Sequence, residues 1–220
     1  MRPFEEEFQS LNDTLQEMGA LVAHSIQRSV LSLVEKNEDY AHQVIRDESR
    51  VDQMEIQIDE TVTSLIVREQ PVARDMRLIV SAIKISTDLE RMGDLAVHIA
   101  ERSLSLMAQQ PLPEFIDFSE ISGLAESMVL GSLDSFVKRD AQTARGILSM
   151  DDAVDKARKT IQRQLTDLMQ RDTTTISRAL DYIIVARKLE RIGDHATNIA
   201  EDVIFLTQGV DVRHRVAEVA

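Results

Sequence analysis

Residues 88–101 read DLERMGDLAVHIAE, and residues 188–201 read KLERIGDHATNIAE. Nine of these fourteen positions carry the same residue at a constant offset of 100. The repetition continues upstream at an offset of 103, where Val51-Asp52 corresponds to Val154-Asp155. The change of three residues falls near Pro71, where a loop tolerates a difference in length. The chain is therefore an internal duplication of one structural unit.

Apolar residues recur at helical spacing through most of the chain, and no segment shows sustained alternation with period two. Around the first repeat motif they fall at Leu78, Ala82, Ile85, Leu89, Met92, Ala96, Ile99 and Leu106. Prolines interrupt this pattern at Pro71 and at Pro111-Leu112-Pro113, where continuing a helix is costly. The pattern predicts helices near 5–36, 38–69, 73–109, 117–139, 141–171 and 174–208.

Long helices joined by short turns pack as up-down bundles. The sequence therefore predicts an all-α fold of two tandem three-helix bundles, with six long antiparallel helices. Residues 1–110 form the first unit, 114–208 the second, and 209–220 a short C-terminal tail.

Composition excludes several classes of protein. The 220 residues carry 25 Lys and Arg against 38 Asp and Glu, a formal net charge of −13. Nucleic-acid binding rests on clustered basic residues, so we expect no nucleic-acid partner. No apolar run reaches the roughly 20 residues of a membrane span. The acidic start, MRPFEEEF, is unlike a secretory signal, and the absence of cysteine fits the cytoplasm.

Pairs of acidic residues four positions apart occur at equivalent places in both repeats. We call Glu48, Asp52, Glu90 and Asp94 the first-half cluster, and Asp151, Asp155, Glu190 and Asp194 the second-half cluster. A spacing of four places both carboxylates of a pair on one face of a helix. If the second and third helices of each unit are neighbours, four carboxylates converge in each half. Such oxygen clusters suit divalent or trivalent metal ions, namely Mg, Ca, Mn, iron or zinc.

The first repeat extends this acidic stripe further than the second. The additional, weaker candidates for metal binding are Glu55, Asp59, Glu101, Glu201 and His98. Arg158 and Gln162 stand where the first repeat has Glu55 and Asp59, so we expect the first site to be more acidic. Gly93 and Gly193 lie between the Glu and Asp of their motifs. Either a neighbouring helix packs closely there, or a bound ion and its ligands need the space.

The paired LERMGD and LERIGD segments, on tandem three-helix units, resemble the PhoU family of phosphate-transport regulators. The resemblance spans nearly the whole chain, including the early segment MRPFEEEFQSLNDTLQEMG. It implies a cytoplasmic, all-helical, often dimeric protein that is not an enzyme and that can lie at the inner membrane through its partners. It also implies negative regulation of phosphate uptake and of the phosphate-starvation response.

The resemblance further implies two partners and a cofactor. The partners are the ATPase subunit of the phosphate ABC transporter and a sensor histidine kinase. The cofactor is iron or zinc, held by the two carboxylate clusters, although Arg158 and Gln162, in place of Glu55 and Asp59, argue against a full-sized second metal cluster. Two alternatives stay open: a metal-dependent, hydrolase-like enzyme with a carboxylate bundle, and a structural bundle whose acidic stripes are merely solvated. No P-loop, dinucleotide-binding, zincin or nucleophile-elbow motif supports catalysis.

Overall fold

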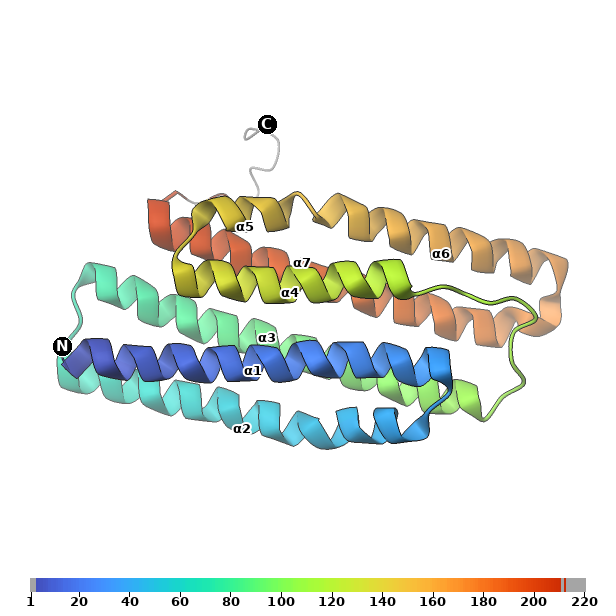
Figure 1. Cartoon of the computed structure of the whole chain (residues 1–220), viewed down its shortest axis with the longest axis horizontal. Coiled ribbons are helices and arrows are strands. Elements are labelled where there is room, and N and C mark those ends of the chain that lie inside the picture. Colours follow the sequence, from blue (N-terminus) through green and yellow to red (C-terminus); the bar gives the residue numbers. More distant parts are fainter. Residues whose placement is uncertain (1–2, 211, 213–220) are drawn as a thin grey trace.

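The computed structural model describes residues 3–210 and 212, so most of the proposed tail, 209–220, lies outside the described residues. The described part is helical, and its elements follow the six expected segments (Figure 1). They are α1 Pro3–Glu35, α2 Glu38–Glu69, α3 Ala73–Met107, α4 Ser119–Lys138, α5 Ala141–Leu148, α6 Asp151–Arg171, the 3₁₀ turn η1 Thr173–Thr175 and α7 Ile176–Gln208. The all-α fold is thus confirmed.

Short polar residues begin several of these helices. Asn37 accepts a hydrogen bond from the backbone N–H of Asp39, and Asp140 accepts from the backbone N–H groups of Gln142 and Thr143. These bonds satisfy N–H groups that have no partner within the helix. The preceding residue in each case, Lys36 or Arg139, turns the chain with a positive φ. The same turn therefore separates the first two helices of both repeats.

The helices form two three-helix units that lie side by side. In Figure 1, α1 and α4 lie in front of α3 and α7, while α2 and α6 form the lower and upper edges. The two units meet where α3 packs against α7 and α1 packs against α4. One continuous hydrophobic cluster runs through both units, with Leu89 and Leu189 fully buried at equivalent positions. The duplicated seams therefore build a single core.

The predicted helix 141–171 is interrupted, and this part of the prediction was wrong. Residues 149 and 150 separate α5 from α6, and the N–H of Met150 donates to the carbonyl of Ile147 in a tightened turn. Gly146 and Ser149 are poorer helix formers than Gln43 and Arg46, their counterparts in the unbroken α2. The Ser149 hydroxyl also donates to the carbonyl of Arg145. Weak local propensity thus ends α5 at Leu148, and α6 begins at Asp151.

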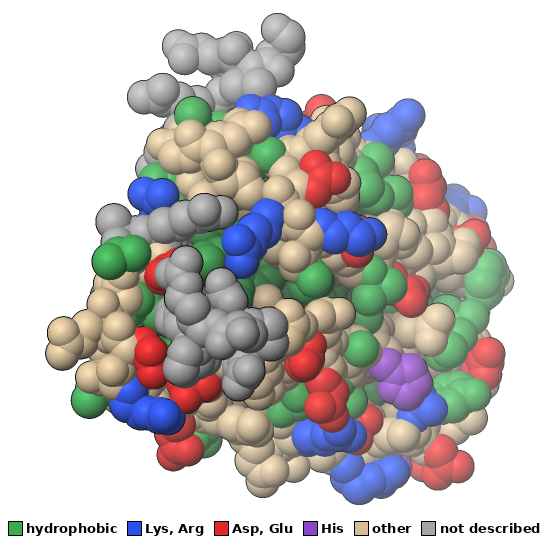
Figure 2. All heavy atoms as spheres, turned by 60° about the vertical axis from the view of Figure 1, so that its left-hand side comes forward, with side chains coloured by type: hydrophobic (Ala, Val, Ile, Leu, Met, Phe, Trp, Pro, Cys, Tyr) green, Lys and Arg blue, Asp and Glu red, His purple; other side chains and the backbone are tan. Residues whose placement is uncertain are grey.

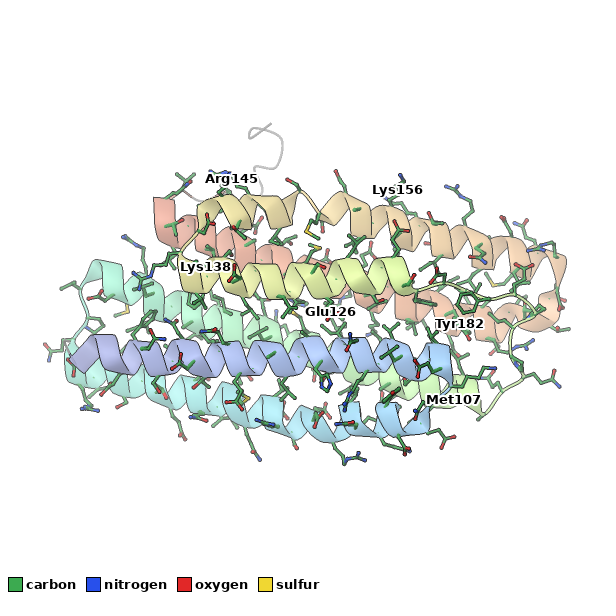
Figure 3. The ribbon with its side chains drawn as sticks, in the orientation of Figure 1. Met107, Glu126, Lys138, Arg145, Lys156 and Tyr182 are labelled. Atoms are coloured by element: carbon green, nitrogen blue, oxygen red, sulfur yellow. The ribbon has the colours of Figure 1, made fainter. Side chains whose placement is uncertain are left out.

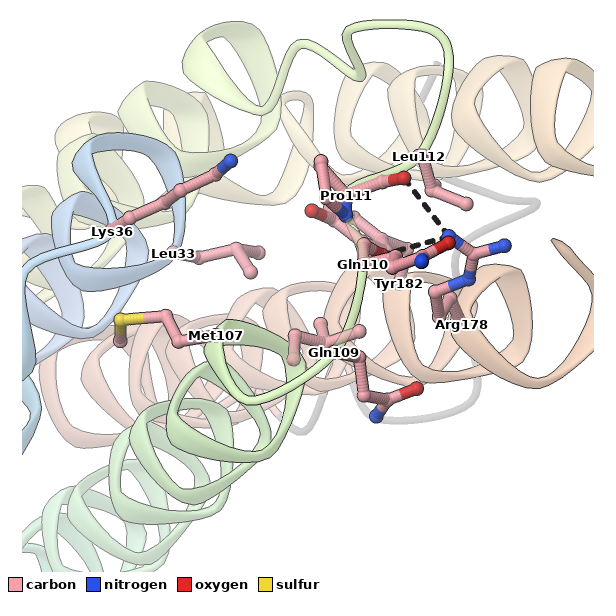
Figure 4. Close-up of a pocket in the computed structure, with 10 residues that line it drawn as sticks. Leu33, Lys36, Met107, Gln109, Gln110, Pro111, Leu112, Arg178 and Tyr182 are labelled. Atoms are coloured by element: carbon pink, nitrogen blue, oxygen red, sulfur yellow. Dashed lines mark hydrogen bonds between the residues drawn. The ribbon is translucent and has the colours of Figure 1, made fainter.

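The connection between the repeats is fastened to α7. The guanidinium of Arg178 donates to the carbonyls of Gln110 and Pro111 at 2.7 and 2.9 Å. Figure 4 shows both bonds, with Leu33 of α1 and Lys36, the residue that follows α1, on the opposite side of the small cavity beside them. The proline-containing connection is thus held in place by the second unit. Within the described residues, no helix is long and apolar enough to cross a membrane.

Candidate metal centre

The seam between the second and third helices of each unit leaves room at its glycine for ordinary van der Waals contact only. A Cβ atom added to Gly93 would lie 3.4 Å from Cγ1 of Val51, and one added to Gly193 would lie 3.5 Å from Cγ1 of Val154. Val51 and Val154 belong to α2 and α6, one residue before the motif aspartates. Of the two explanations for these glycines, the structure favours close helix packing.

This packing brings the first-half cluster together across α2 and α3. Burial raises the pKa of Glu48, and the charges of Asp94 on α3 and Asp52 on α2 raise it further. Glu101 acts in the same direction, while His98 lowers this pKa. Glu101 and His98 are exposed, so they lie at the rim of the cluster.

Glu90 is the most perturbed carboxyl of this cluster. Its pKa is raised from 4.5 to about 7, mainly by burial and further by the charges of Asp94, Glu55 and Asp52, against a smaller decrease from Arg91. Glu55 lies beside it and accepts a hydrogen bond from the Thr87 hydroxyl at 3.1 Å. These carboxylates repel one another, and no described basic side chain forms an ion pair with them. A raised pKa is the expected result of that arrangement.

The chemistry of the first-half cluster fits a divalent or trivalent metal ion. None of its four carboxylates accepts a hydrogen bond or forms an ion pair with another described side chain. Carboxylate oxygens that need a positive partner are the ligands that such ions prefer. As the side chains stand, no three Asp, Glu or His residues of the described chain are close enough to share an ion. Binding would therefore require the side chains of this cluster to move closer together.

The second-half cluster converges in the same way but contains its own cations. Burial, Asp194 and Asp155 raise the pKa of Asp151, and burial raises that of Asp194. Lys159 donates to Asp155 at 2.8 Å and lowers the pKa of that carboxyl. Arg158 donates from Nε to Oε1 of Glu190 at 3.0 Å. Burial nevertheless raises the pKa of Glu190, which also shares a hydrogen bond with Asp155.

Two of the weaker candidates lie elsewhere. Asp59 is exposed and lines a shallow hollow on α2 with Glu60 and Arg68. Glu201 lines a different hollow, between α3 and α7, together with Lys84 and Arg91. The structure therefore places neither residue among the four carboxylates of its half.

The interface between the repeats holds polar contacts that the sequence alone did not identify. His195 Nδ1 lies 2.8 Å from Oδ1 of Asp88, and both side chains are buried. Lys84 donates to the buried Asp202 at 2.9 Å, and Arg102 pairs with Asp181 at 2.9 Å. The signal in the sequence that could have indicated these contacts was the presence of aspartates at otherwise apolar seam positions. Their partners depend on how the two units dock.

The pKa of Glu90 leads to a prediction about the metal-free protein. A carboxyl whose folded-state pKa is raised keeps a proton that the unfolded chain has already lost. The free energy of unfolding should therefore fall as the pH rises from 4.5 to about 7. We expect a loss on the order of 1 kcal/mol after solvent screening. Urea unfolding in EDTA at about pH 5 and about pH 7.5 measures it.

The matched variants are Glu90→Gln, which should make the free energy of unfolding depend less steeply on pH, and Glu60→Gln, which removes an exposed carboxyl of α2 and should leave the pH dependence unchanged. A pH dependence of the free energy of unfolding that is as steep in Glu90→Gln as in the wild type would contradict the assignment.

The fold and its seams define a class of protein: a duplicated three-helix bundle with a carboxylate-lined seam in each half. Comparison with known proteins specifies the family. The sequence-family model of the PhoU domain matches the chain twice, at residues 15–103 and 118–203. The chain belongs to the PhoU family, as its repeat motifs indicated.

Related proteins carry consistent names. A Pseudomonas putida protein named phosphate-specific transport system accessory protein PhoU homolog is 39% identical over 96% of this chain and 83% of its own length. The Escherichia coli protein named phosphate-specific transport system accessory protein PhoU is 32% identical over 96% of this chain and 88% of its own length. These are names of accessory proteins rather than enzymes, in agreement with the prediction that the chain is not an enzyme.

Solved structures agree with the fold. The crystal structure of PhoU from Pseudomonas aeruginosa has a TM-score of 0.90 and 38% identity, covering 94% of this chain and all of that one (100%). The crystal structure of the phosphate transport system regulatory protein PhoU from Streptococcus pneumoniae has a TM-score of 0.86 and 26% identity, covering 95% of this chain and 99% of that one. The chain is therefore an accessory protein of the PhoU type with a role in the regulation of phosphate transport.

Proposed function

We propose that this chain is a cytoplasmic negative regulator of phosphate uptake and of the phosphate-starvation response. In this proposal it acts as an adaptor between the ATPase subunit of the phosphate ABC transporter and a sensor histidine kinase. The single observation that carries the proposal is family membership over nearly the whole chain, with relatives named for the phosphate-specific transport system. A homodimer is the assembly that we expect.

We also propose that the first-half cluster binds a metal ion, with iron or zinc as the leading candidates. Four convergent carboxylates without a cationic partner, two of them with raised pKa values, support this assignment. The ion would neutralise the seam between α2 and α3 and fix the surface beside it. Glu48, Asp52, Glu90 and Asp94 would hold it. Glu55, which lies next to Glu90, is available as a further ligand.

The adaptor role is tested by affinity capture. The immobilised chain is incubated with detergent-solubilised membranes that contain the phosphate transporter and the sensor kinase, once with Zn²⁺ and once with EDTA. We expect the transporter ATPase and the kinase to be retained above the level of an unrelated ABC-transporter ATPase in the same membranes. Retention no higher than that of the unrelated ATPase, in both conditions, would exclude the adaptor role.

A further inference from the structure

The two repeats have equivalent folds but different charges along equivalent helices. Helix α2 carries nine acidic and three basic residues, whereas α5 and α6 together carry four acidic and six basic residues. Much of the difference lies on the outer surface, as with Lys156 and Arg145 at the upper edge of the bundle (Figure 3). Figure 2 shows acidic and basic side chains interspersed over the end of the molecule that faces the viewer. One difference, however, falls inside the carboxylate seam.

That position is Glu55 in the first repeat and Arg158 in the second. The Arg158 side chain is 17% exposed, and its Nε donates to Oε1 of Glu190 at 3.0 Å. Its Nη1 donates to Oε1 of Gln162 at 2.6 Å, which fixes the plane of the guanidinium. Glu55, by contrast, adds a negative charge beside Glu90. The same place in the fold therefore holds a cation in one half and an anion in the other.

Two further features add positive charge to the second-half cluster. Lys159 pairs with Asp155 at 2.8 Å. Asp151 is the first residue of α6, where the free N–H groups and the dipole of the helix favour a carboxylate. In the first half, α2 continues unbroken through Glu48. Arg91, His98 and Lys188 lie within electrostatic reach of that cluster, but none of them forms an ion pair with it.

We infer that Arg158 and Lys159 neutralise the Glu190 and Asp155 side of the second-half cluster, so that this cluster takes no metal ion and metal binding is confined to the first half. The metal clusters that the family resemblance implies for both halves do not fit the second one. An ion between Asp155 and Glu190 would lie against the guanidinium, and like charges in a partly buried site repel strongly. This inference rests on the proposed metal site of the first half.

One consequence concerns regulation. Metal availability would alter the surface beside α2 and α3, while the equivalent surface beside α6 and α7 would keep one electrostatic state. The duplicated protein would thus present one metal-dependent face and one constant face to its partners.

Zinc stoichiometry of the full chain provides the first test. Chelator-treated protein is equilibrated with Zn²⁺ alone, and bound zinc is measured by elemental analysis. Asp155→Asn with Asp194→Asn should retain the wild-type zinc content, whereas Asp52→Asn with Asp94→Asn should lose most of it. Arg158→Glu should bind more zinc than the wild type, because it gives the second-half cluster the negative charge that Glu55 gives the first. An equal loss of bound zinc in the two double variants, relative to the wild type, would overturn the inference.

Thermal unfolding in EDTA provides the second test, independent of any metal. Arg158→Gln should lower Tm by about 3 °C or more, because it leaves Glu190 without its partner. The matched control is Lys156→Gln, which removes an exposed charge from the same helix and should change Tm by less than about 1 °C. Equal effects of the two substitutions would overturn the inference. If wild-type protein binds no zinc at all, the proposed first-half site is wrong, and the comparison of Tm values alone decides the role of Arg158.

Discussion

Replacing Asp52 and Asp94 together by Asn is expected to lower the affinity for Zn²⁺ by about 100-fold or more. Each change removes a carboxylate charge from the seam, and even the outer-shell partners of a metal site are worth about 10–100-fold in affinity. The helices should remain folded, because long helices draw most of their stability from buried apolar faces. Isothermal titration with Zn²⁺ measures the affinity, and circular dichroism at 222 nm measures the helix content.

The matched control for this pair is Asp13→Asn with Asp167→Asn, which removes two exposed carboxylates away from both clusters. Its zinc affinity should equal that of the wild type. An unchanged affinity in Asp52→Asn with Asp94→Asn would show that the first-half cluster is a solvated stripe. A complete loss of helicity would show instead that the carboxylates are essential to the fold.

Leu89→Ala and Leu189→Ala are each expected to lower the free energy of unfolding by about 2–5 kcal/mol. Both side chains are fully buried, at equivalent positions of α3 and α7 in the shared core. Each truncation removes buried apolar surface and leaves a cavity that neighbouring helices fill only in part. For a chain of this length, Tm should fall by about 5–15 °C. Urea and thermal unfolding in EDTA separate this effect from metal binding.

Ile56→Ala is the control for these two variants. Its side chain is 58% exposed on α2, so truncation should change the free energy of unfolding by no more than about 0.5 kcal/mol. A large effect at Leu89 with none at Leu189 would contradict a core shared equally by the two repeats.

Much of the fold was predictable because its information is local and repeated. Helix α2 occupies the predicted residues 38–69, since a polar cap begins it and Pro71 follows its end. The break between α5 and α6 was missed because the apolar period continues through it. Only the weaker helix propensity of Gly146 and Ser149 marks that place. Period and propensity disagree there, and the period predicts an unbroken helix.

The candidate site was predictable as far as helical spacing reaches. Carboxylates four residues apart necessarily share a face, and the seam then brings the two helices together. Whether Glu201 faces its own cluster or the neighbouring unit depends on the docking of α3 against α7, which spacing within one helix does not determine. The contact between Arg158 and Glu190 likewise depends on the register of two helices. The substitution was visible in the sequence, but its consequence required the structure.

In the proposed function, this chain restrains the response to phosphate starvation. The most direct test of this role is transcription of a phosphate-starvation gene in phosphate-rich medium, in a strain from which this chain has been deleted. We predict expression as high as in starved wild-type cells, and a return to the repressed level when the chain is supplied from a plasmid. Normal repression in the deletion strain, with normal phosphate uptake, would contradict the account.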